Sequence, residues 1–274
     1  MSFTQWISDP SIHLQDLTLA MKSRSYASGR RIYTFRIEQQ KFWLKFHEPN
    51  IHKGLEQAFQ RELKFYQENE KIHSNLLLPY QVVQFDQNTA FQSIVDQGQG
   101  LILLDVEPFF TDISQLKSLE AIQQKIITAL DSLNELHQLG WIHGDLKPDH
   151  FRQMDNACKF IDFEQSFKRQ SPISEMNATP HYMAPELFHG QSKSVQSDLY
   201  AFGIILYEWM AQTKLRANSY RDWAVLHCQQ LEIQFPKQLN YFLPLLQGLT
   251  QKHREYRLKN VSEAKNMLNN INLS

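Results

Sequence analysis

The sequence predicts an α+β protein with two lobes, in which a β-rich first part precedes a mainly helical second part. Short apolar runs with strand-like alternation fill about the first hundred positions, and longer segments with apolar residues at helical spacing follow them. Strands and helices therefore do not alternate as they do in a parallel sheet. With 274 residues, 42% of them hydrophobic and 12% aromatic, the chain has material for a substantial core in one large domain or two packed lobes.

The β-rich part is expected to contain a hairpin early in the chain. Two runs rich in β-branched and aromatic residues flank the turn-like residues 38–40, and they cover 31–37 and 41–46. A helix is expected over 55–71, because Phe59, Leu63 and Tyr66 recur at helical spacing. Three further strands and a linker are expected at 76–85, 89–95, 101–104 and 105–108.

The second part is expected to begin with a long helix over 119–139, which has an apolar residue every three or four positions and is ended by Gly140. Short strands are expected around Ile142 and over 159–163. From Ser197 onward helices dominate, and the four candidates are 198–211, 220–231, 239–251 and 261–270.

Composition excludes several classes of protein. The formal net charge of -1 gives no global attraction to nucleic acid or to an anionic membrane. The two cysteines, Cys158 and Cys228, lack metal-type spacing, which favours a reducing compartment. The segment Met1 to Asp16 does not resemble a signal peptide, and no apolar stretch approaches the roughly 20 residues that span a bilayer. We therefore expect a soluble cytoplasmic protein without a membrane span or a nucleic-acid partner.

The most informative segment is HGDLKPDH, residues 143–150. It resembles the catalytic loop of protein kinases, which is usually written H-R-D-L-K-P-x-N. The resemblance implies that Asp145 orients or deprotonates a substrate hydroxyl and that Lys147 steadies the γ-phosphate. The segment departs from the pattern twice, since Gly144 replaces the usual Arg and His150 replaces the usual metal-binding Asn.

Residues on both sides of the segment 143–150 extend the resemblance. Lys45 lies in a predicted strand, where protein kinases place the lysine that holds the inner phosphates, and Glu62 lies on the next predicted helix, where they place its partner. Residues 162–164 read Asp-Phe-Glu where the family has D-F-G, so the resemblance implies that Asp162 binds the metal ion that bridges the phosphates. Glu164 should make this turn stiffer than glycine would, and it adds an oxygen acceptor beside the metal.

Late motifs separate protein kinases from other kinases with this fold. TPHYMAPE at 179–186 resembles G-T-x-x-Y-M-A-P-E, and DLYAFG at 198–203 resembles D-x-x-x-F-G. The resemblance implies that Thr179 shapes the site for a Ser or Thr hydroxyl, that Glu186 pairs with Arg257, and that Asp198 braces the catalytic loop. The chain thus resembles the eukaryotic-type Ser/Thr protein kinase family over nearly its whole length. On that resemblance it is one bilobal kinase domain, made of an N-lobe, a hinge and a C-lobe over 1–104, 105–108 and 109–274.

The resemblance also outlines a nucleotide pocket. The phosphate-covering glycine loop is expected at 23–30, where Gly29 is the one glycine. Leu103 is expected at the back of the pocket. Backbone groups of Asp105 and Val106 are candidates for hydrogen bonds to adenine. A solvent-exposed basic turn at 23–30 remains an equal alternative, because Arg24, Arg30 and Arg31 carry positive charge there.

The departures lead to two hypotheses. Imidazole suits manganese or zinc better than magnesium, so a His150 that binds metal favours manganese, whereas a His150 that only packs leaves the metal to Asp162. Without an Arg at position 144, a phosphorylated activation segment has no obvious partner, and activity should not require phosphorylation within 164–178.

The leading function is ATP-dependent phosphoryl transfer to Ser or Thr hydroxyls of protein substrates, with Mg²⁺ or Mn²⁺. Two alternatives stay open. The first is a pseudokinase that binds nucleotide as a scaffold, which His150, Glu164 and the poor glycine loop favour. The second is a small-molecule kinase on the same fold, which the His-Gly-Asp and Asp-Phe-Glu triplets favour and the segment 179–186 opposes.

Overall fold

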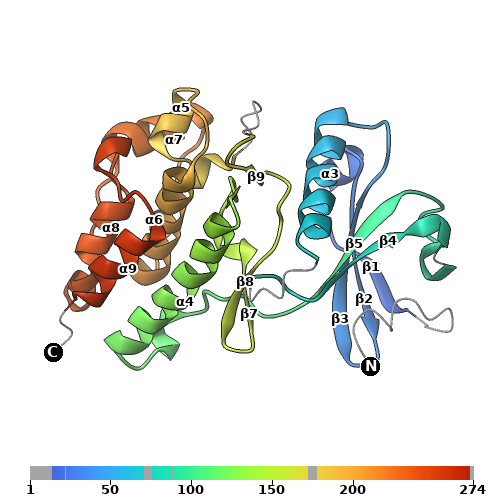
Figure 1. The fold of residues 1–274 in the computed structure, drawn as a ribbon, viewed down its shortest axis with the longest axis horizontal. Helices are drawn as coiled ribbons and strands as arrows, with labels where there is room; N and C mark the ends of the chain where they lie inside the picture. Colours follow the sequence, from blue (N-terminus) through green and yellow to red (C-terminus); the bar gives the residue numbers. More distant parts are fainter. Residues whose placement is uncertain (1–13, 22, 71–75, 88, 172–177, 272–274) are drawn as a thin grey trace. The chain divides into compact units, whose positions relative to one another are not determined.

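The computed structural model describes residues 14–21, 23–70, 76–87, 89–171 and 178–271. The chain divides into two compact units (Figure 1). Unit 1 contains Met1–Glu107 together with Asp162–Glu164, and unit 2 contains Pro108–Ile161 and Gln165–Ser274. Unit 1 is built on an antiparallel sheet and unit 2 is mainly helical, so the predicted α+β class is confirmed. None of the helices in the described ranges combines the length and the apolar character needed to cross a bilayer.

Unit 1 contains a five-stranded antiparallel sheet with the strand order β1-β2-β3-β5-β4. The predicted hairpin is β2 and β3, which pair from Arg30↔His47 to Ile37↔Gln40 around a tight turn. Glu38 enters the left-handed region in this turn, with φ 53°. The strands are β1 (Gln15–Leu19), β2 (Arg30–Ile37), β3 (Gln40–His47), β4 (Tyr80–Gln84) and β5 (Gln99–Leu104).

Unit 1 also carries the helices α2 (Ser23–Ala27) and α3 (Lys53–Glu68). The side chain of His52 caps α3 by accepting a hydrogen bond from the Leu55 amide. One face of α3 is buried, and this amphipathic pattern is the reason that the sequence predicts a helix here. The predicted end at residue 71 lies outside the described residues.

One predicted strand of unit 1 is wrong. Within 89–95 the structure has a single 3₁₀ turn, Thr89–Phe91. Phe91 is fully buried there and packs edge-on against Phe35 and Phe85. A turn that buries one large ring satisfies this apolar segment without an alternating pattern, so the short apolar run was misleading.

Unit 2 is organised around helix α6 (Val195–Ala211), in which every side chain from Ser197 to Met210 is buried. A helix that is apolar on all sides can lie only inside a core. Ser194 and Ser197 start it with reciprocal capping hydrogen bonds. The other helices are α4 (Leu119–Gln138), α5 (Pro185–Phe188), α7 (Tyr220–Val225), α8 (Leu243–Leu249) and α9 (Val261–Asn269).

Two predicted helices of unit 2 are shorter than expected. The segment 220–231 changes from α7 into a π-helical turn at Leu226–Gln230. The segment 239–251 begins as the 3₁₀ helix Lys237–Phe242 and becomes α-helical at Leu243, just before Pro244, because proline is accepted in the first turn of a helix.

The described residues of unit 2 also form the short strands β6 (Trp141–Ile142), β7 (Phe151–Met154), β8 (Ala157–Phe160) and β9 (Phe167–Lys168). Strands β7 and β9 were not predicted. Strand β7 forms a hairpin with β8, and the two turn residues Asp155 and Asn156 both have positive φ, 49° and 61°. This is the backbone of a type I′ turn, so the Asp-Asn pair was the available signal.

Candidate active site

Unit 1 holds a dense charge cluster around Lys45. Its Nζ lies 2.6 Å from Glu62 Oε2, 3.0 Å from Asp162 Oδ1 and 2.8 Å from Glu164 Oε1. The four residues come from β3, from α3 and from the segment 162–164. The structure thus brings together Lys45, Glu62 and Asp162, which are far apart along the chain, and the pair of Lys45 with Glu62 is the one that the resemblance implied.

Local sequence explains how these side chains reach each other. On β3 the alternation buries Phe42, Leu44 and Phe46 on one face, so Lys45 lies on the other face. Glu62 lies on the buried face of α3 and accepts a hydrogen bond of 3.0 Å from the Phe163 amide.

The aromatic ring of Phe163 anchors the segment 162–164 in unit 1. It stacks on Phe65 with ring centroids 3.7 Å apart and meets Tyr66 edge-on. Both partners lie on α3, which also carries Glu62. Asp162 is in the left-handed region with φ 64°, a backbone conformation that Asp tolerates better than most residues.

The charges of the cluster shift the pKa values of its own members. Burial lowers the pKa of Lys45, but the carboxylates of Asp162, Glu164 and Glu62 outweigh it, and the pKa ends well above its usual range. Burial raises the pKa of Glu62, and the nearby Lys45 ammonium only partly opposes this. Lys45 is therefore a permanent cation in this unit.

Glu164 is the unusual member of the cluster. Besides Lys45, its carboxylate forms an ion pair with Arg30, and its carbonyl accepts a hydrogen bond of 3.2 Å from Arg61 Nε. Three cationic side chains thus hold the residue that replaces the usual glycine, which gives the expected stiffness of this turn a physical basis. Arg30 was noted in the sequence only as one of several charges near Gly29.

Three carboxylates of this cluster fit a divalent cation. Glu62, Asp162 and Glu164 offer oxygens that all lie within 4.8 Å of one another. Hard oxygen donors are the ligands that magnesium and manganese prefer. His150, the other predicted metal ligand, is not a member of this group.

The predicted nucleotide-pocket residues also lie in unit 1. Leu103 is buried on β5 opposite Trp43 of β3 and Tyr80 of β4. The Asp105 amide donates to the Lys41 carbonyl at 2.9 Å, and its carboxylate lies 3.0 Å from Lys41 Nζ. A bond from Asp105 to adenine would therefore have to use its carbonyl, which narrows the prediction for this residue; Val106 stays a prediction.

Gly29 has a packing role at the place expected for a flexible loop. Its backbone has φ 86°, and a Cβ there would lie 2.7 Å from His47 Cε1 and 3.1 Å from the Glu48 carbonyl. Glycine is needed for both reasons. The preceding residues form helix α2, so much of the expected glycine loop is a short helix. A phosphate contact of Gly29 stays a prediction.

In unit 2, Asp198 fixes the backbone of the segment 143–150. Its carboxylate accepts hydrogen bonds from the amides of His143 and Gly144, both 2.9 Å, and lies 3.0 Å from His137 Nε2. Burial acts to raise the pKa of Asp198, but these hydrogen bonds and the neighbouring histidines hold it below its usual range. Asp198 thus stays ionised, as a carboxylate that accepts several hydrogen bonds should.

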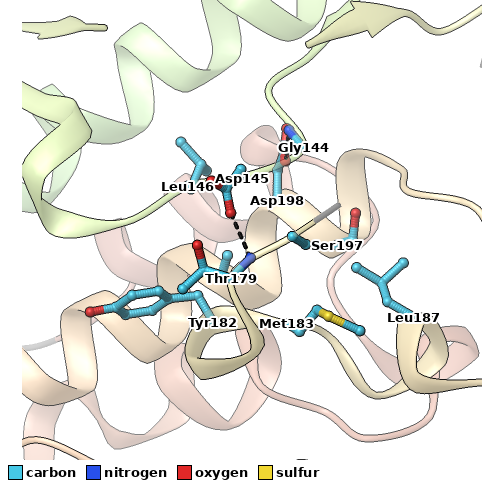
Figure 2. A pocket seen from close by; sticks show the side chains of 11 residues that line it. Gly144, Asp145, Leu146, Thr179, Tyr182, Met183, Leu187, Ser197 and Asp198 are labelled. Atoms are coloured by element: carbon cyan, nitrogen blue, oxygen red, sulfur yellow. Dashed lines mark hydrogen bonds between the residues drawn. The ribbon is translucent and has the colours of Figure 1, made fainter. Parts of the chain in front are cut away.

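Asp145 lies beside the segment that begins at Thr179 (Figure 2). Its Oδ1 accepts a hydrogen bond of 2.8 Å from the Thr179 amide, and Lys147 Nζ lies 3.9 Å from Oδ2. The cavity between these segments has about 10 Å³, which is room for one water molecule at most. Asp145, Lys147 and Thr179 are therefore close together in unit 2.

His150 is buried in the same loop. Its ring stacks on His143 with centroids 5.4 Å apart, its amide donates to the Lys147 carbonyl, and its carbonyl accepts from the Ile161 amide. These contacts support the interpretation of His150 as a residue that packs and holds the loop. Its role as a metal ligand stays a prediction.

Gly144 cannot be replaced by the family's Arg without moving the chain. It has φ 77°, and a Cβ there would lie 2.6 Å from the Gln165 carbonyl oxygen. The same position lies 3.1 Å from Cδ and 3.4 Å from Nζ of Lys193. A cation therefore lies beside the segment 143–150, although it comes from position 193 and not from position 144. No motif in the sequence indicated Lys193.

Ser166 has a structural role that the sequence did not indicate. It is buried, and its hydroxyl donates a hydrogen bond of 3.0 Å to the His143 carbonyl. A modifying enzyme cannot reach this hydroxyl while it is buried, so Ser166 serves the packing of the segment 143–150.

Glu186 and Arg257 form a buried bidentate ion pair. Arg257 Nη1 donates to Glu186 Oε1 at 2.7 Å and Nη2 donates to Oε2 at 2.8 Å. Further hydrogen bonds run from the guanidinium to backbone carbonyls of Gln196, Gln251 and Lys252. The pair ties α5 to the segment before α9, at the position implied for it by the resemblance.

Residues 33–270 match the protein kinase domain family, and the chain belongs to that family. The predicted bilobal kinase fold is thereby confirmed. The kinase PK-1 of Cydia pomonella granulovirus has a similar structure, with a TM-score of 0.64 over 92% of both chains at 19% sequence identity.

Curated relatives are serine/threonine kinases and a cyclic-nucleotide-dependent kinase. The serine/threonine-protein kinase TIO of Arabidopsis thaliana is 28% identical over 84% of this chain and 17% of its own length. A probable serine/threonine-protein kinase of Clostridium acetobutylicum is 30% identical over 51% of this chain and 23% of its own. The cGMP-dependent protein kinase of Toxoplasma gondii is 36% identical over 33% and 9%. The chain thus matches less than a quarter of the length of each of these three relatives.

Proposed function

We propose that this chain transfers the γ-phosphoryl group of ATP to Ser or Thr hydroxyls of proteins. The observation that carries the proposal is the placement of Asp145. Its carboxylate is held by the Thr179 amide on a loop whose backbone is fixed by Asp198, and Lys147 lies beside it. Phosphoryl transfer depends on such positioning and on charge neutralisation more than on covalent chemistry.

The residues divide the work between the two units. Asp145 accepts or orients the proton of the attacking hydroxyl, and Lys147 supplies positive charge for the transferred group. Lys45, a permanent cation, binds the inner phosphates, and Glu62 keeps it in place. Asp162, with Glu164 beside it, holds a magnesium or manganese ion, which neutralises phosphate charge when bound.

Relatives named as serine/threonine kinases support hydroxyl side chains of proteins as the acceptor. The lobes proposed for this reaction are residues 1–104 and 109–274, joined by a hinge at 105–108. The boundary between the two compact units falls within that hinge segment, between Glu107 and Pro108.

The test is transfer from labelled ATP by the purified chain, to itself and to a mixture of peptides, in magnesium or manganese. We expect Asp145→Asn to lose transfer by at least about a hundredfold, because general-base contributions are of about that size. The matched control is Asp149→Asn, an exposed aspartate on the same loop. Equal transfer by the Asp145 variant and the control would contradict the proposal. Equal rates in the two metals would contradict the manganese preference suggested by His150.

A pseudokinase is the second candidate, and Glu164 is the observation that favours it. The carboxylate of Glu164 forms ion pairs with Lys45 and Arg30, the cations that a nucleotide phosphate would need. In that case ATP would stabilise the chain against heat, and no transfer would be seen in either metal.

A further inference from the structure

Helix α7 runs into a π-helical turn, Leu226–Gln230, and this turn carries a fully buried histidine, His227. The Leu231 amide closes the turn by donating a hydrogen bond of 2.7 Å to the Leu226 carbonyl, five residues back. Such turns are rare and occur often at functional sites. A buried polar ring also needs hydrogen-bond partners, so the contacts of His227 indicate what the turn supports.

The His227 ring belongs to a stack of aromatic rings that reaches the residues 179–182, here called the acceptor segment. The Trp223 ring lies 5.7 Å from the His227 ring and 4.5 Å from the His181 ring, measured between centroids. The Phe188 ring of α5 lies 5.8 Å from the His227 ring. The planes of the rings in these three contacts differ by 21°, 28° and 21°. The stack therefore packs the turn against the acceptor segment.

The two nitrogens of the His227 ring have different partners. The hydroxyl of Tyr200 on α6 lies 2.9 Å from Nδ1. Burial raises the pKa of Tyr200 well above its usual range, so the hydroxyl keeps its proton and donates it to Nδ1. Burial lowers the pKa of His227 to about 4, so its ring is neutral near pH 7 and carries one proton. Because Nδ1 accepts, this proton lies on Nε2.

Backbone groups of the acceptor segment lie close to the same ring. Burial lowers the pKa of His227, whereas hydrogen bonding with the backbone of His181 and Pro180 acts in the opposite direction. A backbone group that raises the pKa of an imidazole is a carbonyl oxygen, because it accepts from the protonated ring. These carbonyls are suitable acceptors for the proton on Nε2.

The acceptor segment in turn contacts Asp145. The Thr179 amide donates to Asp145 Oδ1 at 2.8 Å (Figure 2). The Tyr182 amide donates to the Thr179 carbonyl at 3.0 Å and closes the 3₁₀ turn Pro180–Tyr182. A displacement of the backbone within this turn would therefore move the amide that holds Asp145.

We propose that His227 is a positioning residue for phosphoryl transfer. Its Nε2–H donates to a carbonyl of the acceptor segment, and the Tyr200 hydroxyl fixes the tautomer that makes this possible. The segment then keeps Asp145 in place through the Thr179 amide. The effect on transfer rests on the proposed function, but the support of the acceptor segment does not. A ring that only filled space could be replaced by phenylalanine without loosening the segment.

Three substitutions separate the ring nitrogens from the volume of the ring. His227→Phe keeps a ring in the stack and removes both nitrogens. His227→Gln keeps an amide near the place of Nε2, and His227→Asn keeps one near the place of Nδ1. The phenylalanine has a similar volume, so the fold should be retained, which circular dichroism and urea unfolding check. The matched control is His253→Phe, at an exposed histidine of the same unit.

The first measurement is hydrogen exchange at single amides, followed by NMR. We expect the Thr179 and Tyr182 amides to exchange at least about tenfold faster in His227→Phe and His227→Asn, the effect of losing one buried hydrogen bond. His227→Gln and the control should stay within about threefold of the wild type. Amides within α6 are the reference for the stability of the whole unit.

Three results of the exchange experiment would overturn the proposal. The first is unchanged exchange of the acceptor segment in His227→Phe. The second is equal acceleration of the acceptor segment and α6, which would indicate a packing role alone. The third is a glutamine variant that protects the segment no better than the asparagine variant, which would contradict a hydrogen bond from Nε2.

The second measurement is transfer from labelled ATP to a peptide that the wild type phosphorylates. His227→Phe should lower kcat about tenfold, and His227→Gln should restore most of it. The KM for ATP should not change, because Lys45 lies in unit 1. A wild type without transfer would contradict the proposed function, while the exchange experiment would still decide the role of His227. A wild type with transfer and a His227→Phe variant of equal kcat would overturn the positioning role.

Discussion

Breaking the ion pair between Glu186 and Arg257 should strongly destabilise unit 2. The perturbation is Glu186→Gln, which keeps the shape of the side chain and removes its charge. Arg257 is 1% exposed, so its guanidinium would stay buried without a counter-ion. An uncompensated buried charge of this kind costs about 3–5 kcal/mol.

The remaining hydrogen bonds of Arg257 place the expected cost of Glu186→Gln at the lower end of that range. The guanidinium keeps hydrogen bonds to the carbonyls of Gln196 and Gln251, and the amide oxygen of the substituted side chain can accept one more. We therefore expect a loss of about 3 kcal/mol in the free energy of unfolding. Arg257→Met should cost about 4 kcal/mol, because it also removes the contact of the guanidinium with the Tyr200 ring.

The assay is urea unfolding followed by circular dichroism and tryptophan fluorescence, with coincidence of the two curves as the test of two-state behaviour. The double variant should cost less than the two single costs added together, because removing both charges leaves none uncompensated. Glu255→Gln serves as the control, since Glu255 is exposed and should change stability by less than about 0.5 kcal/mol. Single costs below about 1 kcal/mol, or strictly additive costs, would refute the reasoning.

Four further outcomes are expected. Gly144→Ala should lower the free energy of unfolding by at least about 1–2 kcal/mol in a urea titration, because φ is 77° and the added Cβ meets the Gln165 carbonyl; no change would show that the loop adjusts freely. Burial lowers the pKa of His227 to about 4, so between about pH 6.5 and pH 4 this side chain is protonated in the unfolded chain and neutral in the folded chain. The free energy of unfolding should therefore fall by about 3 kcal/mol as the pH drops from about 6.5 to about 4. His227→Gln should flatten this dependence in unfolding measured at several pH values. Glu164→Gln should tighten ATP binding about fivefold in calorimetry, since one competing negative charge leaves Lys45 and Arg30, and weaker binding would instead indicate that Glu164 helps to hold the metal. Ser171→Ala should keep full transfer activity in the labelled-ATP assay, as expected if no activation-segment phosphate is required.

The sequence predicted the long, strongly patterned elements well and the short ones poorly. The hairpin β2–β3 and the helices α3, α4, α6 and α9 follow periodicity that a reader can count. The segment 89–95 failed because one buried ring, Phe91, decides its structure through tertiary packing. Strand β7 was missed because its signal lies in two turn residues and not in an apolar pattern.

The residues of the candidate site also differ in how well the sequence predicted them. Residues with a motif around them, such as Asp145 and Asp198, were identified from sequence, and the structure places them in contact with the partners expected of them or close to them. Lys193 and Arg30 had no motif, since a single lysine or arginine is ordinary on any surface. Only the fold brings Lys193 to Gly144 and Arg30 to Glu164. The departures from the family pattern at Gly144 and Glu164 were visible in the sequence, but the cations that the fold places beside them were not.

The hydrogen bonds that Asp198 accepts have a consequence for how unit 2 opens and closes. Loop amides normally exchange with solvent quickly, because local opening costs little free energy. The amides of His143 and Gly144 donate instead to a carboxylate inside the most buried helix of unit 2. Deuterium should therefore enter this loop about as slowly as it enters α6. A substitution that loosens α6 would then displace Asp145 long before the unit as a whole unfolds.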